Sequence, residues 1–231
     1  MIKDEWPDDA ANVAFPEYFR QVGSGTAIEG ASVVTLAVDD RFTMRVTPAG
    51  RPAETVASHA GQLVLHSHEP DETAVLDVLR RCHGQLAVAH ALCEAGVFEI
   101  YRAICQLRGV RASHSNAVQV ALAASRAESP ECAHAISMFC GLLGDAAGRA
   151  ALTVGSTGGV FVKGAIVAQL GDTFARSPFR RRFEGAGRFP DMLRAVPTFV
   201  TRVRLQDVAT LRARQAGSRY RLRHPCQPVA E

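Results

Sequence analysis

Glycines, hydroxyl side chains and a lysine are concentrated in the stretch TVGSTGGVFVKGAIV, which runs from Thr153 to Val167. A glycine has no Cβ, so its backbone can approach a ligand closely and point amide N–H groups at a phosphate. On this interpretation the nucleotide-binding residues are Gly155, Ser156, Thr157, Gly158, Gly159, Lys163 and Gly164. The alternative is a set of structural turns that pack a strand on a helix. The spacing alone leaves both interpretations open.

Other residues of catalytic or metal-binding type lack partners at a fixed spacing. Asp39 and Asp40 are expected in a solvated turn, and they would repel a triphosphate unless a metal ion bridged them. The stretch HSHEPDE at 66–72 contains metal-ligand types, with His66 and His68 on one face of an expected strand. Without a second ligand pair we expect the polar end of a strand and an acidic helix start instead. We predict no metal site and no catalytic nucleophile.

The net charge of +3 is unevenly distributed along the chain. Between Arg176 and Arg223 there are 13 arginines and 3 acidic residues, so this stretch carries +10 and the remainder −7. The segment FARSPFRRRFEGAGRF interleaves Phe with Arg, a combination that can bind nucleic acid. A solvated helical surface is the simpler explanation, and we do not expect a nucleic-acid partner.

The composition is that of an ordinary globular protein, with 47% apolar and 21% charged residues. No apolar run approaches the roughly 20 residues that span a bilayer, and the acidic N-terminus lacks the apolar core of a signal peptide. The six cysteines form no CxxC pair, which indicates reduced thiols. We therefore expect a cytoplasmic protein without a membrane partner.

Hydrophobic periodicity predicts strands near both ends and helices between them. A hairpin is expected within 31–50, a third strand over 61–68 and another at 198–203, while 15–23 is expected to be a short helix or turn. Helices are expected over 71–84, 86–109 with a break near Ala95–Gly96, 115–125, 130–152, 173–195 and 205–215. Thr153–Val167 is expected to form strand, turn, strand, turn. This order indicates an α/β or α+β layer architecture.

The segments AISMFCGLLGDAAGRAALTVGSTGGVFVKGAIV and SPFRRRFEGAGRFPDMLRAVPTFV together resemble the signature region of the bacterial glucokinase family. The resemblance implies an α/β fold, the C-terminal, larger lobe of an actin-like ATPase, with the N-terminal lobe lacking. It also implies a domain at 21–215, preceded by an acidic lead at 1–20 and followed by a basic tail at 216–231. Glucose and ATP with Mg²⁺ are the implied substrates of an active member.

The resemblance also implies where site residues have been replaced. The family's phosphate-binding Asp-Gly-Gly-Thr hairpin and the Asn-Asp residues that supply its catalytic base have no counterpart in this chain. The residues DDRFTM stand where a glycine-rich phosphate turn is usual. The sugar-binding Glu-Gly-Gly-His element has become HAGQ, so His59 and Gln62 are the sugar-binding candidates. Ala89 stands at a glutamate position, CEAG replaces Ser-Gly-Pro-Gly, and Lys163-Gly164-Ala165 replaces a double-glycine turn.

Three hypotheses follow. The first is a truncated glucokinase-family protein without catalysis that retains weak nucleotide or sugar binding. The second is an interaction or regulatory module that uses the family's dimer surface to form a homodimer or to pair with a related kinase. The third is an active kinase whose missing lobe lies on another chain.

Overall fold

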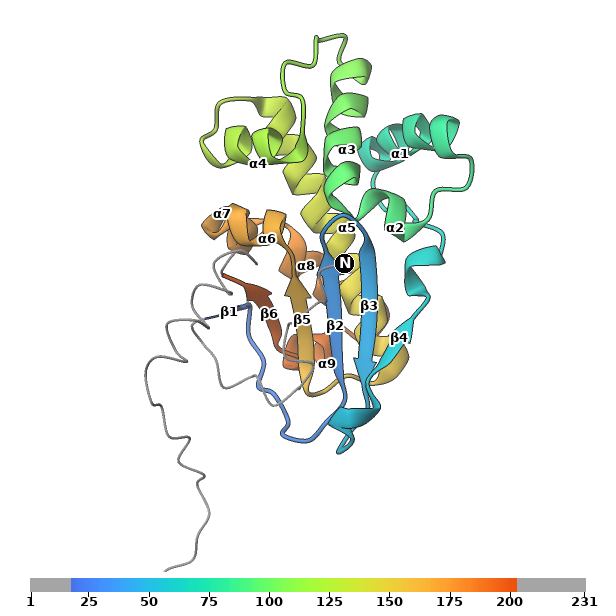
Figure 1. Cartoon of the computed structure of the whole chain (residues 1–231), viewed down its shortest axis with the longest axis vertical. Helices are drawn as coiled ribbons and strands as arrows, with labels where there is room; N and C mark the ends of the chain where they lie inside the picture. Colours follow the sequence, from blue (N-terminus) through green and yellow to red (C-terminus); the bar gives the residue numbers. More distant parts are fainter. Residues whose placement is uncertain (1–17, 203–231) are drawn as a thin grey trace, which may run out of the picture.

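The computed structural model describes residues 18–202, and they form one six-stranded sheet with helices around it (Figure 1). The strand order is β1-β6-β5-β2-β3-β4, with β5 parallel to both β2 and β6 and the other pairs antiparallel. The strands are β1 Phe19–Val22, β2 Val33–Val38, β3 Phe42–Thr47, β4 Val56–Ser58, β5 Gly159–Lys163 and β6 Thr198–Thr201. Because β2 and β5 run parallel at the centre, their carboxyl ends meet at one edge of the sheet.

The longest helix, α5 (Pro130–Val154), begins as its sequence indicates and ends two residues after the predicted end. The Ser129 side chain accepts a hydrogen bond from the Cys132 N–H, Pro130 occupies the first turn, and Gly155 ends the helix in the left-handed region. The helix is long and apolar enough to cross a membrane, but 78% of its apolar window is buried inside the fold. It is therefore the core helix, and Figure 1 shows it running behind the sheet into the helical cluster.

The remaining helices fall into two groups. One group lies beyond the β2–β3 turn at the top of Figure 1, and its members are α1 Pro70–His83, α2 Val88–Ala91, α3 Glu94–Leu107 and α4 Ala117–Ser125. The other group follows β5, and its members are α6 Ala165–Leu170, α7 Asp172–Arg176, α8 Phe179–Glu184 and α9 Pro190–Ala195. Two short 3₁₀ helices, η2 Pro52–Glu54 and η3 Ala60–Gln62, flank β4.

Most of the predicted elements are confirmed. The hairpin, α1, α4, α5, the helices after residue 172 and the strand near 198 form as expected, and Gly84 ends α1 with a positive φ of 69°. The break between α2 and α3 lies at Leu92–Cys93, slightly before the predicted position. The predicted helix at 205–215 and the tail at 216–231 lie outside the described residues.

Three local predictions were wrong. Residues 61–68 form η3 and an isolated bridge between Val64 and Ala87, so the third strand is β4 instead. Residues 19–22 form strand β1, because they pair with β6, and this strand spans the predicted boundary between residues 20 and 21. Thr153 and Val154 belong to α5, whose end propagates until Gly155.

Candidate functional site

The turn after β5 packs against the end of β2 at the carboxyl edge of the sheet. Ala37 and Lys163 are paired in the parallel register, and Gly164 follows directly. A Cβ built on Gly164 would lie 2.2 Å from the Val38 carbonyl oxygen, and the residue has a φ of +154°. Only glycine fits this position, because both the contact and the backbone conformation exclude a side chain.

Asp39 ties this edge of the sheet to two helices. Its Oδ1 accepts a hydrogen bond from the Ala165 N–H at 3.0 Å, and its carbonyl oxygen accepts one from the Glu94 N–H at 2.8 Å. The β2–β3 turn therefore holds the first residues of both α6 and α3. Asp40 instead points to solvent with a side chain 87% exposed. The expectation of a solvated aspartate pair is thus confirmed for Asp40 and wrong for Asp39.

The glycines at the start of β5 lie at the other edge of the sheet from Lys163 and Gly164. The length of β5 separates Gly159 from Lys163, which is roughly 13 Å at 3.3 Å per residue. Ligands of open α/β sheets bind outside the carboxyl ends of parallel strands. Lys163 and Gly164 lie at that end, whereas Gly155, Ser156, Thr157, Gly158 and Gly159 do not.

The turn from Gly155 to Gly159 has a packing role. The buried Ser156 hydroxyl lies 3.0 Å from the Ser32 carbonyl oxygen and 2.8 Å from that of Gly159, so its proton is used within the fold. The Gly158 N–H donates to Ser32 O at 3.0 Å, and a Cβ on Gly158 would lie 2.8 Å from the Ala31 carbonyl oxygen. These contacts fasten the end of α5 to the segment before β2.

The sugar-binding candidates lie beside the β2–β3 hairpin. His59 directly precedes η3 and Gln62 is its last residue, and both side chains are exposed. Between them, a Cβ on Gly61 would lie 3.3 Å from both the Ala89 methyl and the Phe42 ring. The structure thus brings 59–62 and Ala89, which the resemblance implicates together, into one neighbourhood. Ala89 presents a methyl group there and has no acceptor for a hydroxyl.

The histidines of HSHEPDE belong to no metal centre within the described part of the chain. Among residues 18–202, no group of three His, Cys, Asp or Glu side chains could hold an ion. His66 and His68 do not share a strand face, since no strand forms there. The His68 Nε2 instead lies 3.3 Å from Asp145 Oδ2 and 3.1 Å from the Arg149 guanidinium.

A buried charge network, which the sequence did not reveal, joins α1, α5 and α8. The Arg182 guanidinium donates to Glu72 Oε1 at 2.6 Å and also hydrogen-bonds Asp145. Burial would raise the pKa of Glu72, but hydrogen bonds from Arg182 and the His68 N–H, with the charge of Arg182, hold that pKa below its ordinary value. The two carboxylates raise the pKa of Arg182 despite its burial.

One signal for this network was present in the sequence. Asp145 interrupts the otherwise apolar run GLLGDAAG, and an acid in a buried helix is rare unless it is paired. The neighbouring arginine of α8, Arg180, is also used within the fold. It donates to Glu184 at 2.7 Å and to the Val196 carbonyl oxygen at 2.9 Å. These two arginines of the basic segment therefore hold helices together.

Sequence comparison decides the family. The family model described as Glucokinase matches residues 42–213. The chain belongs to the glucokinase family. A glucokinase of Aromatoleum aromaticum is 35% identical over 182 residues, covering 78% of this chain and 55% of that protein. A glucokinase of Nitrobacter hamburgensis is 40% identical over 129 residues, covering 56% and 40%. The chain thus spans about half the length of these curated relatives.

The fold comparison agrees with this assignment. The crystal structure of a glucokinase from an Antarctic psychrotroph superposes with a TM-score of 0.73 at 24% identity, over 80% of this chain and 57% of that one. The α/β architecture is thus that of one lobe of a glucokinase-type, actin-like ATPase.

Proposed function

We propose that this glucokinase-family chain does not transfer phosphate to a sugar by itself. The observation that carries the proposal is the hydrogen bond from the Ala165 N–H to Asp39 Oδ1 at 3.0 Å. A carboxylate of the chain itself uses the backbone donor after Gly164 and adds negative charge where the resemblance expects a glycine-rich phosphate turn. A triphosphate is therefore expected to bind here only weakly, because like charges repel.

Weak binding of nucleotide or sugar remains part of this proposal. Lys163 and Gly164 are the proposed nucleotide-facing residues, and His59 and Gln62 the proposed sugar-facing ones. Gly155, Ser156, Thr157, Gly158 and Gly159 are assigned to packing, because their contacts are within the fold. The free cysteines among the described residues suit the cytoplasmic location that the proposal includes.

Thermal unfolding with ligands tests the proposal. The chain, an Asp39→Ala variant and a full-length glucokinase are heated with ATP·Mg²⁺ and with glucose, since a ligand that binds only the folded state raises the Tm. We expect a small shift or none for the chain, a larger ATP·Mg²⁺ shift for Asp39→Ala, and large shifts for the glucokinase. Glucose-dependent ATP consumption by the pure chain in a coupled assay would refute the proposal.

Pairing with another chain is a second candidate function. Val56 on the edge strand β4 is 59% exposed, and Leu63 beside η3 is 65% exposed. Exposed apolar side chains next to an unpaired strand edge favour a protein contact. Sedimentation of the chain alone and mixed with a glucokinase tests this candidate. A chain that stays monomeric in both samples at micromolar concentration would argue against it.

A further inference from the structure

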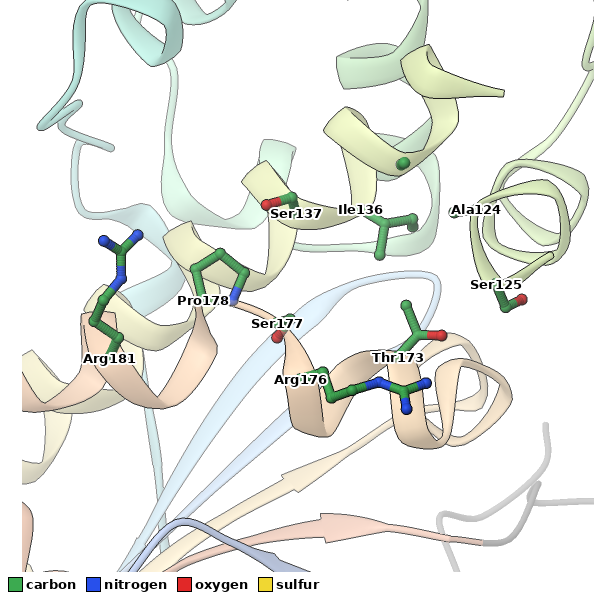
Figure 2. Close-up of a pocket in the computed structure, with 10 residues that line it drawn as sticks. Ala124, Ser125, Ile136, Ser137, Thr173, Arg176, Ser177, Pro178 and Arg181 are labelled. Carbon is green, nitrogen blue, oxygen red and sulfur yellow. The ribbon is translucent and has the colours of Figure 1, made fainter. Parts of the chain in front are cut away.

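A cavity of about 650 Å³ lies between α4, α5, α7 and α8 (Figure 2). This volume is in the range of small-molecule sites. None of the residues assigned above to nucleotide or sugar contacts lines it, so the cavity is separate from the candidate site. Ile136 and Pro178 form apolar walls, while serine, threonine and arginine side chains surround them.

The guanidinium groups of two arginines at the cavity make no hydrogen bond or ion pair with any residue of 18–202. Arg176 on α7 and Arg181 on α8 are both exposed, and Figure 2 shows Arg176 beside Thr173 and Arg181 apart from them, beyond Pro178. They differ in this from Arg180 and Arg182, whose guanidinium groups donate hydrogen bonds to acids and carbonyl oxygens. Asp172, the acid that begins α7, hydrogen-bonds Arg20, and Arg176 acts on it through its charge without a hydrogen bond or ion pair. Within residues 18–202, no acid or carbonyl oxygen holds either guanidinium group in place.

The hydroxyl groups of the cavity differ in what they can offer. Ser177 donates to the Phe174 carbonyl oxygen at 2.6 Å, and Ser125 donates to the Ala121 carbonyl oxygen at 2.7 Å, so both protons are used. The hydroxyls of Ser137 and Thr173 have no hydrogen-bond partner among the described residues. Thr173 and Arg176 are three residues apart on α7 and so lie on one face of that helix.

We propose that this cavity binds a small phosphate monoester with a hydroxylated organic body. The Arg176 guanidinium and the Thr173 hydroxyl supply the donors for the phosphate, because the planar guanidinium fork matches a pair of phosphate oxygens. Ala133 and Pro178 contact the body of the ligand over the largely buried Ile136, and Ser137 donates to one of its hydroxyls. Arg181 adds positive charge at the other end. The proposal concerns binding only and stands apart from the function proposed above.

Calorimetric titration of the full chain at low salt tests the site. The probes are ribose 5-phosphate, inorganic phosphate and ribose. Ribose 5-phosphate is expected to bind, inorganic phosphate to bind more weakly because it lacks the body, and ribose not to bind. Arg176→Gln is expected to weaken ribose 5-phosphate binding by about tenfold or more, the usual effect of losing a charged hydrogen bond.

Arg188→Gln is the matched control, since Arg188 is also exposed, has no such partner among residues 18–202 and lies outside the cavity. It removes the same charge and should leave ribose 5-phosphate binding within about twofold of the parent, because exposed charges contribute little at a distance. Equal weakening by both variants, or no binding of ribose 5-phosphate to the parent chain at millimolar concentration, overturns the proposal.

Discussion

Arg182 lies between two buried carboxylates, Glu72 from α1 and Asp145 from α5. Arg182→Met would leave both without their cation, and such losses typically cost about 3–5 kcal/mol of unfolding free energy. Urea denaturation at pH 7 measures the loss. The neighbouring Arg181 is exposed, so Arg181→Met should change stability by no more than about 0.5 kcal/mol. Equal effects of the two substitutions would contradict this account.

The parent chain and the Arg182→Met variant should differ in how their unfolding free energy depends on pH. Because the pKa of Glu72 is lowered in the folded chain, its contribution to stability is present above its ordinary pKa of 4.5 and is lost as the pH falls through the folded value. In Arg182→Met the buried Glu72 carboxylate lacks its cation, so protonation of Glu72 removes an unpaired charge and lowers the cost of burying this side chain. The destabilisation caused by Arg182→Met should therefore be smaller at pH 4 than at pH 7. Urea midpoints at both pH values check this.

Gly164 and Gly155 differ in why a side chain would be unfavourable at each position. Gly164→Ala would place a methyl group 2.2 Å from the Val38 carbonyl oxygen, whereas nothing lies within 4 Å of a Cβ on Gly155. Gly155→Ala should cost only the backbone strain at its φ of +61°, about 1–2 kcal/mol. Gly164→Ala adds a clash and should cost about 1–3 kcal/mol more. Similar losses in urea would show that the β2 contact is unimportant.

At the scale of elements, small residues on α5 let α8 pack closely against it. A Cβ on Gly148 would lie 2.4 Å from the Phe183 carbonyl oxygen, but a Cβ on Gly141, earlier on the same helix, would make only ordinary contacts of 3.6 Å or more. Gly148→Ala should therefore destabilise the chain by about 1–3 kcal/mol. Gly141→Ala should stabilise it by up to about 1 kcal/mol through helix propensity. Chemical denaturation of both variants measures the difference.

At the scale of the whole molecule, four cysteines report on global unfolding. Cys93, Cys105, Cys132 and Cys140 are buried, whereas Cys82 is exposed. Burial raises the pKa of Cys140 to about 12, so this thiol is protonated as well as shielded. In a Cys226→Ser variant, Ellman's reagent at pH 8 should modify one thiol quickly and the other four only in urea. A second fast thiol would indicate local opening of the helical cluster.

Much of the helical structure could be predicted, because its signals are local. The cap at Ser129 and the proline at 130 set the start of α5 from neighbouring residues alone, whereas its end at Gly155 was not predicted. β1 could not be predicted in this way. Its four residues became a strand because Phe19 pairs with Thr201, a partner far along the chain. Residues 61–68 have a strand-like pattern but form only an isolated bridge, because no strand lies beside them in register.

The candidate site, too, was predictable from the sequence only in its local features. Glycines at 158, 159 and 164 could be recognised as positions that need close backbone approach, but the sequence could not say which end of β5 faces a ligand. The contact of Asp39 with Ala165 joins residues 126 apart. An aspartate pair read locally indicates a turn, and only packing decided that one carboxylate turns inward to the α6 backbone while the other faces water.

By itself the sequence determined the family, the hairpin and the helices, because periodicity, capping and a long run of family-typical residues are properties of neighbouring positions. The tertiary structure alone decided that Gly155–Gly159 and Lys163–Gly164 lie at opposite ends of a strand, and that Glu72, Asp145 and Arg182 share one buried network. These features depend on which distant segments pack together. The physical reason is that burial and pairing energies act between residues that only the folded chain brings into contact.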